Sequence, residues 1–213
     1  MELKKDKKRI EVIKPFGPSI IKFQMPEELV NEINLYVDKI ILDNSKIEKL
    51  DHSKSLAGQV TQEFILEIEF MKKIKWAEFL MDAFTQWLKY EYPKRNVKNF
   101  NLVRSWVVRQ FKNEYNPVHW HGGQISGVGY LKVPNDINKC NKKSHVQTDG
   151  KLVLIDGYRS LFSSGIFPIE PKVGDFYMFP NHLMHTVYPF FGTDEERRSI
   201  SFNADLDPEA KSL

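Results

Sequence analysis

Two histidines separated by a single residue stand in the stretch 116–134, NPVHWHGGQISGVGYLKVP. In an extended chain, side chains at positions i and i+2 point to the same face. His119 and His121 can therefore reach one metal ion, whereas Trp120 between them points the other way. The pattern predicts a pair of metal ligands at the mouth of a strand.

A third histidine completes a candidate ligand set. His185 precedes an alternating run at 186–188, whereas His182 would face the opposite side of an extended chain, so we choose His185. Such a set occupies one face of an octahedron and leaves positions for a bidentate cosubstrate and dioxygen. Imidazole suits Fe(II), but zinc, copper and nickel also accept it, so the ligand types alone do not choose the metal.

An arginine after the third histidine indicates the kind of cosubstrate. In the stretch 195–203, EERRSISFN, strand alternation places Arg197 and Ser199 on one face and Arg198 on the other. A guanidinium and a hydroxyl on an inward face fit a carboxylate at the end of a short diacid. The alternative is that both arginines lie on the surface and form ion pairs with Glu195 and Glu196.

The N-terminal half is expected to be scaffold. Apolar residues recur there at helical spacing after two short isoleucine-rich runs. The expected elements are two strands within 10–24, a helix over 26–41, a loop over 44–58, a helix from about Thr61 that includes Phe64 and Ile65, and a helix over 74–92.

From about residue 97 the helical periodicity gives way to alternation. Strands are expected at 101–115, 125–133, 151–156, 175–179, 185–190 and 197–204, with an exposed polar excursion at 135–148. Strands after a helical half predict an α+β protein with a helix-supported β-sandwich or barrel. We expect one domain over 1–213, with 1–97 as mainly helical support and 98–206 as the core that holds the metal site.

Composition narrows the classes of function. The single cysteine excludes an intrachain disulfide framework and thiolate metal clusters. The chain has no apolar run of membrane-spanning length and no signal-peptide pattern at its charged start, so we expect a cytoplasmic protein with no membrane partner. The net charge of +3 is small and much of the basic excess lies within 4–9, so nucleic acid is not the expected partner. The oligomeric state stays open.

The histidine pair, the segment GDFYMFPNHLMH that ends at His185 and the segment RRSISFN resemble the 2-oxoglutarate and Fe(II)-dependent oxygenase superfamily, in particular a group distantly similar to prolyl 4-hydroxylases. The resemblance covers about 99–205 and implies a double-stranded β-helix, or jelly-roll. It implies that His119 and His185 bind Fe(II). It also implies that Arg197, assisted by Tyr130, binds the distal carboxylate of 2-oxoglutarate.

One position departs from that pattern. Most of the superfamily has His-x-Asp or His-x-Glu where this chain has His-Trp-His. Three interpretations stay open: His121 replaces the carboxylate in a three-histidine site, His121 is the first ligand and Gly123 falls where the carboxylate should be, or the site binds no metal. The first interpretation is favoured, because both imidazoles share one face of the strand.

The expected activity is hydroxylation of a C–H bond in a peptide or small metabolite, with consumption of dioxygen and release of succinate and CO₂. Candidates for the substrate mouth are Trp106, Arg109, Tyr115 and Trp120. The alternative is a cupin-like metal-binding module, or a dioxygenase or isomerase that uses three histidines without 2-oxoglutarate. Arg197 and Ser199 distinguish the two, since a cupin has no need of a diacid clamp.

Overall fold

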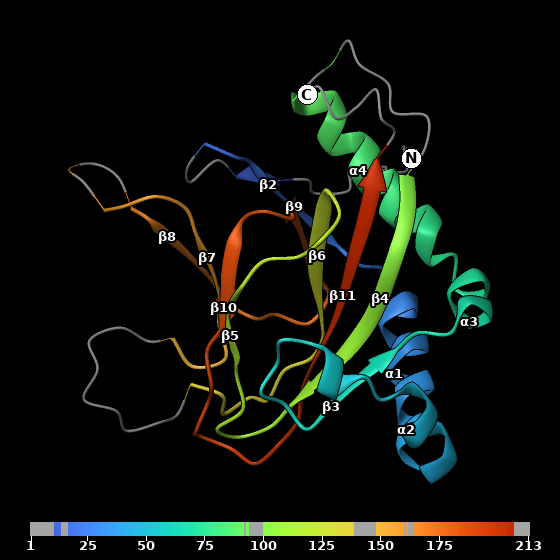
Figure 1. Cartoon of the computed structure of the whole chain (residues 1–213). Helices are drawn as coiled ribbons and strands as arrows, with labels where there is room; N and C mark the ends of the chain where they lie inside the picture. Colours follow the sequence, from blue (N-terminus) through green and yellow to red (C-terminus); the bar gives the residue numbers. More distant parts are fainter. Residues whose placement is uncertain are drawn as a thin grey trace, which may run out of the picture.

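Two antiparallel sheets and four α-helices make up the described part of the computed structural model, which covers residues 11–13, 17–91, 93, 100–138, 148–159, 161 and 164–206 (Figure 1). The larger sheet contains, in spatial order, β1 (Glu11–Ile13), β2 (Ile20–Gln24), β9 (Asp175–Pro180), β6 (Ile125–Lys132), β11 (Arg197–Leu206), β4 (Phe100–Gln110) and β3 (Gln62–Ile65). The smaller sheet contains β5 (Asn116–His119), β10 (Met184–Val187), β7 (Leu152–Ile155) and β8 (Ile166–Ile169). The helices are α1 (Glu27–Ile41), α2 (Asn44–Leu50), α3 (Ile68–Lys73) and α4 (Trp76–Glu91), with a 3-10 turn at Ser53–Ser55.

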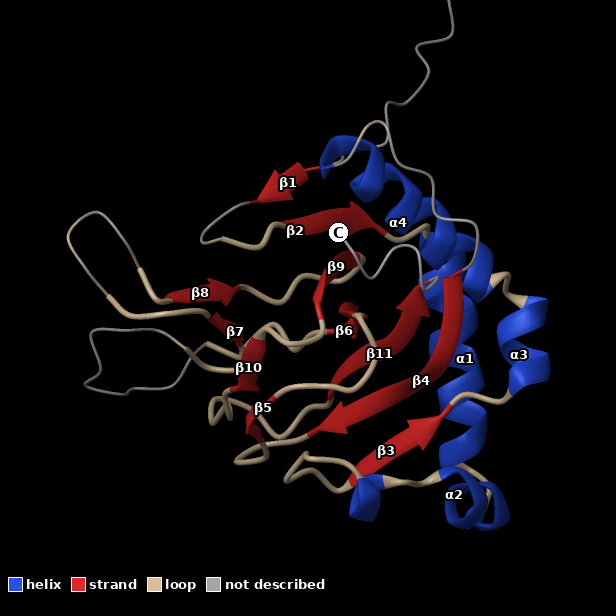
Figure 2. Ribbon diagram, turned by 45° about the horizontal axis from the view of Figure 1, so that its top comes forward, coloured by secondary structure: helices blue, strands red, loops and turns tan. Residues whose placement is uncertain are grey.

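Helices α1 and α4 lie on the face of the larger sheet that is turned away from the smaller sheet (Figures 1 and 2). Their buried residues, among them Ile33 and Trp76, share one apolar cluster with Ile200 and Phe202 of β11. The Trp76 indole donates a hydrogen bond to the Ser105 hydroxyl of β4 at 2.7 Å. Because neighbours along a strand alternate, Arg197, Ser199 and Ser201 of β11 face the space between the sheets.

A glycine on β6 lets the helix side of the larger sheet pack closely. A Cβ on Gly129 would lie 2.6 Å from Cδ2 of Phe176 and 2.9 Å from Cε of Met25. Without it, the rings of Phe176 and Phe202 stack with their centroids 5.9 Å apart. β6 can therefore sit at the centre of the sheet with aromatic rings pressed against its backbone.

Register aligns polar side chains on the face between the sheets. Ser199 of β11 pairs with Val108 of β4 on one side and with Tyr130 of β6 on the other. Glu63 of β3 pairs with Val108 in turn, so Glu63, Ser199 and Tyr130 stand in one row across four strands. A second apolar cluster, which includes Tyr130 and Leu154, joins this face to the smaller sheet.

Two assignments in the N-terminal half are wrong. The expected loop at 44–58 begins with helix α2, because Asp43 caps it by accepting hydrogen bonds from the backbone N–H groups of Ser45 and Lys46 at 3.1 and 3.3 Å. The expected helix from Thr61 is β3 followed by α3, which begins only at Ile68. Pairing with β4 makes 62–65 a strand despite its helical spacing.

The other expected elements are confirmed with shifted ends. The structure contains both strands within 10–24, the helices over 26–41 and 74–92, and the six predicted later strands. β4 ends at Gln110 rather than at Tyr115, because the chain turns at Asn113, whose φ is 70°. β8 was not predicted, and its Pro168 suits the edge position that the strand occupies.

The mixed helix-and-sheet class is confirmed, whereas the single domain over 1–213 stays a prediction. Residues 4–9 and 139–147, which hold the basic segment and most of the polar excursion, lie outside the described residues. Among the helices of the described ranges, none is long and apolar enough to span a membrane.

Candidate metal centre

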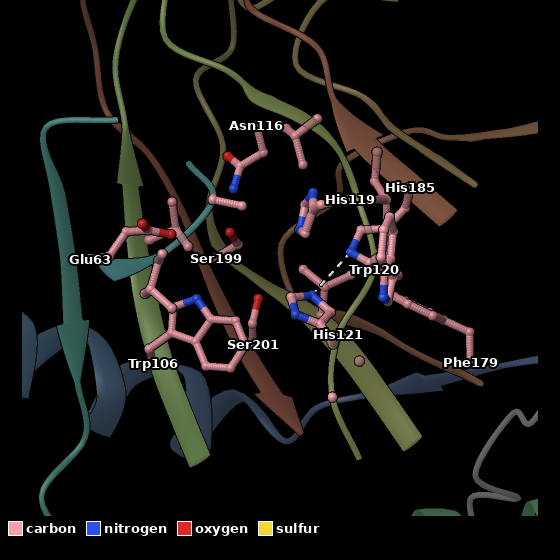
Figure 3. Close-up of a pocket in the computed structure, with 18 of the residues that line it drawn as sticks. Glu63, Trp106, Asn116, His119, Trp120, His121, Phe179, His185, Ser199 and Ser201 are labelled. Carbon is pink, nitrogen blue, oxygen red and sulfur yellow. Dashed lines mark hydrogen bonds between the residues drawn. The ribbon is translucent and has the colours of Figure 1, made fainter. Parts of the chain in front are cut away.

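Three histidines from different elements converge between the two sheets. His119 ends β5, and its Cα is paired in register with His185 of β10. His121 follows two residues after His119, and one ligand atom from each imidazole lies within 4.8 Å of the others. The Nε2 atoms of His121 and His185 are 3.1 Å apart, the contact drawn as a dashed line in Figure 3. All three residues chosen from the sequence are thus brought together.

Backbone carbonyls fix the orientation of two of the rings. Nδ1 of His119 lies 2.7 Å from the carbonyl oxygen of Pro117, and Nδ1 of His185 lies 2.9 Å from that of Leu183. A ring that donates Nδ1–H to a carbonyl keeps its Nε2 lone pair free, so each ring can present Nε2 to an ion.

Asn181 holds the backbone of His121 in place. Its side-chain amide donates to the His121 carbonyl at 2.8 Å, and its own carbonyl accepts from the His121 N–H at 3.2 Å. These two bonds place His121 opposite the turn after β9, although it lies beyond the last residue of β5.

Burial keeps the imidazoles neutral. Burial, together with a smaller contribution from the neighbouring His119, lowers the pKa of His121 to about 4 and that of His185 to about 3. Burial also lowers the pKa of His119. Because a metal binds only the neutral ring, the three side chains are in the ligating form at neutral pH before any ion arrives.

Arg197 is a buried cation that has no counter-ion among the described residues, and it lies on the face of the larger sheet that borders the metal centre. Arg197 is 1% exposed, and its Nη1 donates to Oε1 of Gln110 at 3.0 Å and to the Ser199 hydroxyl at 3.5 Å. Its Nε and Nη2 have no hydrogen-bond partner among the described residues. An unpaired buried guanidinium is costly, so this position calls for an anionic ligand.

A second unpartnered donor is adjacent. The guanidinium carbon of Arg197 lies 5.1 Å from the centroid of the Tyr130 ring, and the fully buried Tyr130 hydroxyl has no partner in the described ranges. Burial raises the pKa of Tyr130 to about 12, so the phenol keeps its proton. With the Ser199 hydroxyl, these groups offer donors to a carboxylate, and the residues therefore fit the cosubstrate that the sequence predicts.

One cavity connects the two groups of side chains. It has a volume of about 250 Å³ and is lined by all three histidines, Arg197 and Ser199. Tyr130 is not among the lining residues of this cavity. Trp106 and Trp120 also line the cavity, and the Trp106 ring lies 5.6 Å from that of His121.

The remaining candidates lie elsewhere. Arg198 is buried on the helix side, where it bonds to Asp38 of α1 at 2.8 Å and to Glu196 at 2.7 Å, so strand alternation separates the two arginines as predicted. Arg109 pairs with Glu196 and lies outside the cavity lining, and so does Tyr115. His182 is exposed and lines a different cavity.

Among the lining residues that sequence reasoning missed are the polar residues Glu63 and Asn116. Glu63 was hidden because 61–71 was interpreted as a helix. The adjacent apolar residues Phe64 and Ile65 gave only a weak indication that Gln62–Ile65 is a strand.

Comparisons with known proteins agree with this geometry. Residues 104–203 match the family 2OG-FeII_Oxy_5, described as "Putative 2OG-Fe(II) oxygenase". No curated protein is similar to the chain in sequence.

Solved structures show the same fold at low sequence identity. A prolyl-4-hydroxylase from Pseudomonas putida aligns with a TM-score of 0.55 and 15% identity over 86% of this chain and 91% of that one. A prolyl hydroxylase from Trichoplax adhaerens, in complex with a hypoxia inducible factor peptide fragment, gives 0.56 and 12% over 91% and 86%. The viral collagen prolyl hydroxylase of Paramecium Bursaria Chlorella virus-1 in its 2OG complex gives 0.52 and 15% over 87% and 94%.

The matched segment contains all three histidines together with Arg197, Ser199 and Tyr130. Residues 104–203 therefore match a family of 2-oxoglutarate and Fe(II)-dependent oxygenases, whose cofactors are Fe(II) and 2-oxoglutarate, and the chain shares its fold with prolyl 4-hydroxylases.

Proposed function

We propose that this protein is an Fe(II)- and 2-oxoglutarate-dependent dioxygenase that hydroxylates a C–H bond of a peptide or small metabolite. The observation that carries the proposal is the cavity in which three neutral imidazoles and an unpaired buried guanidinium occur together. A three-histidine module without a keto acid would have no use for that guanidinium, which is why the cupin-like alternative is less favoured.

His119, His121 and His185 would hold the iron, with His121 in place of the carboxylate that most of the superfamily uses. A third neutral ligand leaves the ion with one more positive charge than a carboxylate would. The bound iron supplies the activation of dioxygen and the oxidation of the substrate. The protein itself supplies position, charge and the exclusion of water.

Arg197 and Ser199 would bind the distal carboxylate of 2-oxoglutarate, and the Tyr130 hydroxyl would donate to the same group. Arg197 is already held by Gln110, so little side-chain freedom is lost on binding. The keto acid would supply the anion that this buried cation lacks. Trp106 and Trp120 would line the approach of the substrate.

The proposed architecture is a double-stranded β-helix formed by the strands of 98–206, in a single domain over 1–213 in which 1–97 adds helices as support and the strands β1, β2 and β3 to the larger sheet. Burial of residues from α1 and α4 with the outer face of the larger sheet supports that role for the helices. This packing leaves the face between the two sheets free to line the metal centre.

The test is release of succinate from 2-oxoglutarate by protein loaded anaerobically with Fe(II), with and without dioxygen. We expect slow, iron-dependent release that is lost in His119→Ala and His185→Ala, which should also bind Fe(II) poorly. His182→Ala is the matched control, because His182 is exposed outside the cluster. Tight iron binding without any binding or turnover of 2-oxoglutarate would favour the cupin-like module instead.

A further inference from the structure

Glu63 is a buried carboxylate that neither the iron nor the cosubstrate requires. Its side chain is 1% exposed, and its Oε2 has no hydrogen-bond partner among the described residues. None of the lysine or arginine side chains in the described ranges forms an ion pair with it. Burial and the nearby Asp51 carboxylate raise the pKa of Glu63 to about 7. A buried acid without a partner destabilises the fold, so its presence calls for a ligand.

Glu63 faces the cavity of the metal centre. Figure 3 shows Glu63 and Trp106 on one side of this cavity and His185 and Phe179 on the other. The carboxylate does not belong to the group of ligand atoms within 4.8 Å of one another, which contains only the three histidines among the described residues. Glu63 therefore lies at the site without being placed as a metal ligand.

The backbone leaves room for this carboxylate. A Cβ on Gly58 would lie 3.0 Å from Oε2 of Glu63 and 3.1 Å from Nδ2 of Asn116, which also lines the cavity. The absence of a side chain at Gly58 thus leaves space for the side chains of Glu63 and Asn116. Glu63 comes from β3, outside the segment 104–203 that matches the family.

Charges of opposite sign are separated across the sheet. Ser199, beside Arg197, stands two strands away from Glu63 in the same row, and Arg197 and Glu63 form no ion pair with each other. Each is left free for a ligand of opposite charge. The cation fits the anionic cosubstrate, and the carboxylate fits a cationic group of the second ligand.

We propose that Glu63 is a specificity-determining residue that binds an ammonium or guanidinium group of the substrate, so that the enzyme acts on a lysine- or arginine-like side chain. This assignment rests on the proposed function. Glu63 and the three histidines line one cavity of about 250 Å³, so a side chain bound to Glu63 would lie beside the metal centre. Trp106, which lines the same side and is 4% exposed, offers an aromatic face to a guanidinium.

The experiment is calorimetric titration of protein loaded with Mn(II) and N-oxalylglycine, which do not turn over. The probes are L-arginine and L-lysine, with L-citrulline and L-norleucine as uncharged counterparts. A second arm uses a blocked pentapeptide with a central arginine and its citrulline counterpart, which separates a free amino acid from a residue within a peptide. We expect at least one cationic probe to bind and its neutral counterpart to bind roughly tenfold to hundredfold more weakly.

Glu63→Gln keeps the shape of the side chain and removes the charge, so it should abolish that preference while leaving the affinity for N-oxalylglycine unchanged. Glu63→Asp should retain the preference in part. Glu48→Gln, on the exposed surface of α2, is the control for loss of one negative charge. Unchanged cation affinity in Glu63→Gln would overturn the assignment. Equal binding of neutral and cationic probes, or no binding of any probe, would overturn it as well.

The failure of this inference differs from failure of the proposed function. Protein that binds Mn(II) and N-oxalylglycine but no cationic probe retains the proposed function and loses the role of Glu63. Protein that binds neither Mn(II) nor N-oxalylglycine loses the proposed function. The titration of cationic probes is repeated on metal-free protein, so it decides the role of Glu63 in that case too.

Discussion

Two side chains of the site, Arg197 and Glu63, are suited to bind ligands but lower the stability of the ligand-free protein. Arg197 and Glu63 are each 1% exposed, have opposite charges when Glu63 is ionised, and lack counter-ions among the described residues. The imidazoles are different, because their neutral form suits both burial and metal binding. The fold should therefore be most strained at the two charged residues when the cavity is empty.

Glu63 should make the ligand-free protein less stable as the pH rises. Its pKa is 4.5 in the unfolded chain and about 7 in the folded protein, so the folded state binds the proton more tightly. The stability gained from the protonated acid is present below pH 4.5 and is lost as the pH rises to about 7. Unfolding by urea of wild type and Glu63→Gln at pH 5 and pH 8 measures this loss.

From pH 5 to pH 8, the unfolding free energy of wild type should fall by about 2–3 kcal/mol more than that of Glu63→Gln. Glu48→Gln, which removes an exposed charge, should show no comparable shift. If the Glu63→Gln difference is the same at pH 5 and pH 8, the folded protein does not hold this carboxyl at a raised pKa.

At the scale of the element, strand β11 places two adjacent arginines on opposite faces, where they have different roles. Arg197 faces the cavity, whereas Arg198 ties the strand to Asp38 of α1 and to Glu196. Arg197→Ala should raise the KM for 2-oxoglutarate roughly 30-fold or more, because a charge-assisted pair to a buried carboxylate is lost. It should leave the unfolding free energy of the ligand-free protein almost unchanged, since it removes an unpaired cation.

Arg198→Ala should show the opposite pattern. It leaves carboxylates on α1 and beside β11 without their shared partner, so unfolding should become easier by about 3 kcal/mol while the KM for 2-oxoglutarate stays near that of wild type. Steady-state kinetics and urea unfolding of Arg197→Ala and Arg198→Ala measure these opposite effects on KM and on unfolding free energy. Equal effects of the two variants on KM would mean that the faces of β11 are not separated.

The central strand β6 should tolerate no side chain at one of its glycines. The Cβ of Gly129→Ala would press on Phe176 at 2.6 Å, so this substitution should lower the unfolding free energy by about 1–3 kcal/mol. Gly17→Ala is the matched control, because a Cβ there would meet nothing within 4 Å. Thermal unfolding of both variants measures the contrast. Equal stability would show that the Phe176 ring packed against β6 moves aside freely.

Sequence reasoning predicted the elements that carry strong periodicity and failed where pairing overrides it. α1, α4 and β11 repeat apolar residues over ten or more positions, and all three were placed correctly. β3 has only four residues, and its pairing with β4, over forty positions away, decides its form. No local pattern could reveal such a partner.

The same limit applies to the site. The His-x-His spacing and the arginine face follow from alternation within one strand, so they were predictable. The cavity that joins Glu63 to the histidines depends on the order of strands in the larger sheet, which no single strand encodes. The unpaired state of Arg197 depends on the absence of a neighbouring acid among the described residues, which only the assembled sheet reveals.

At the scale of the whole molecule, ligand binding should strengthen the fold in two separable steps. The metal centre joins β5 and β10 of the smaller sheet, whereas Arg197 belongs to β11 of the larger one. The metal should therefore stabilise the pairing of β5 with β10 in the smaller sheet, and the keto acid should connect the metal centre to Arg197 in the larger sheet. Each ligand binds the folded state alone, so each adds stability by mass action.

Mn(II) and then N-oxalylglycine, each at about 100 times its Kd, should each add about 2.7 kcal/mol, or about 5–10 °C in Tm. His185→Ala should lose both increments, because the metal would no longer bind. Arg197→Ala should keep the increment from Mn(II) and lose most of that from N-oxalylglycine, whereas Arg198→Ala should keep both from a lower starting Tm. Differential scanning fluorimetry of the four proteins measures these steps. A full N-oxalylglycine increment in Arg197→Ala would show that another cation holds the distal carboxylate.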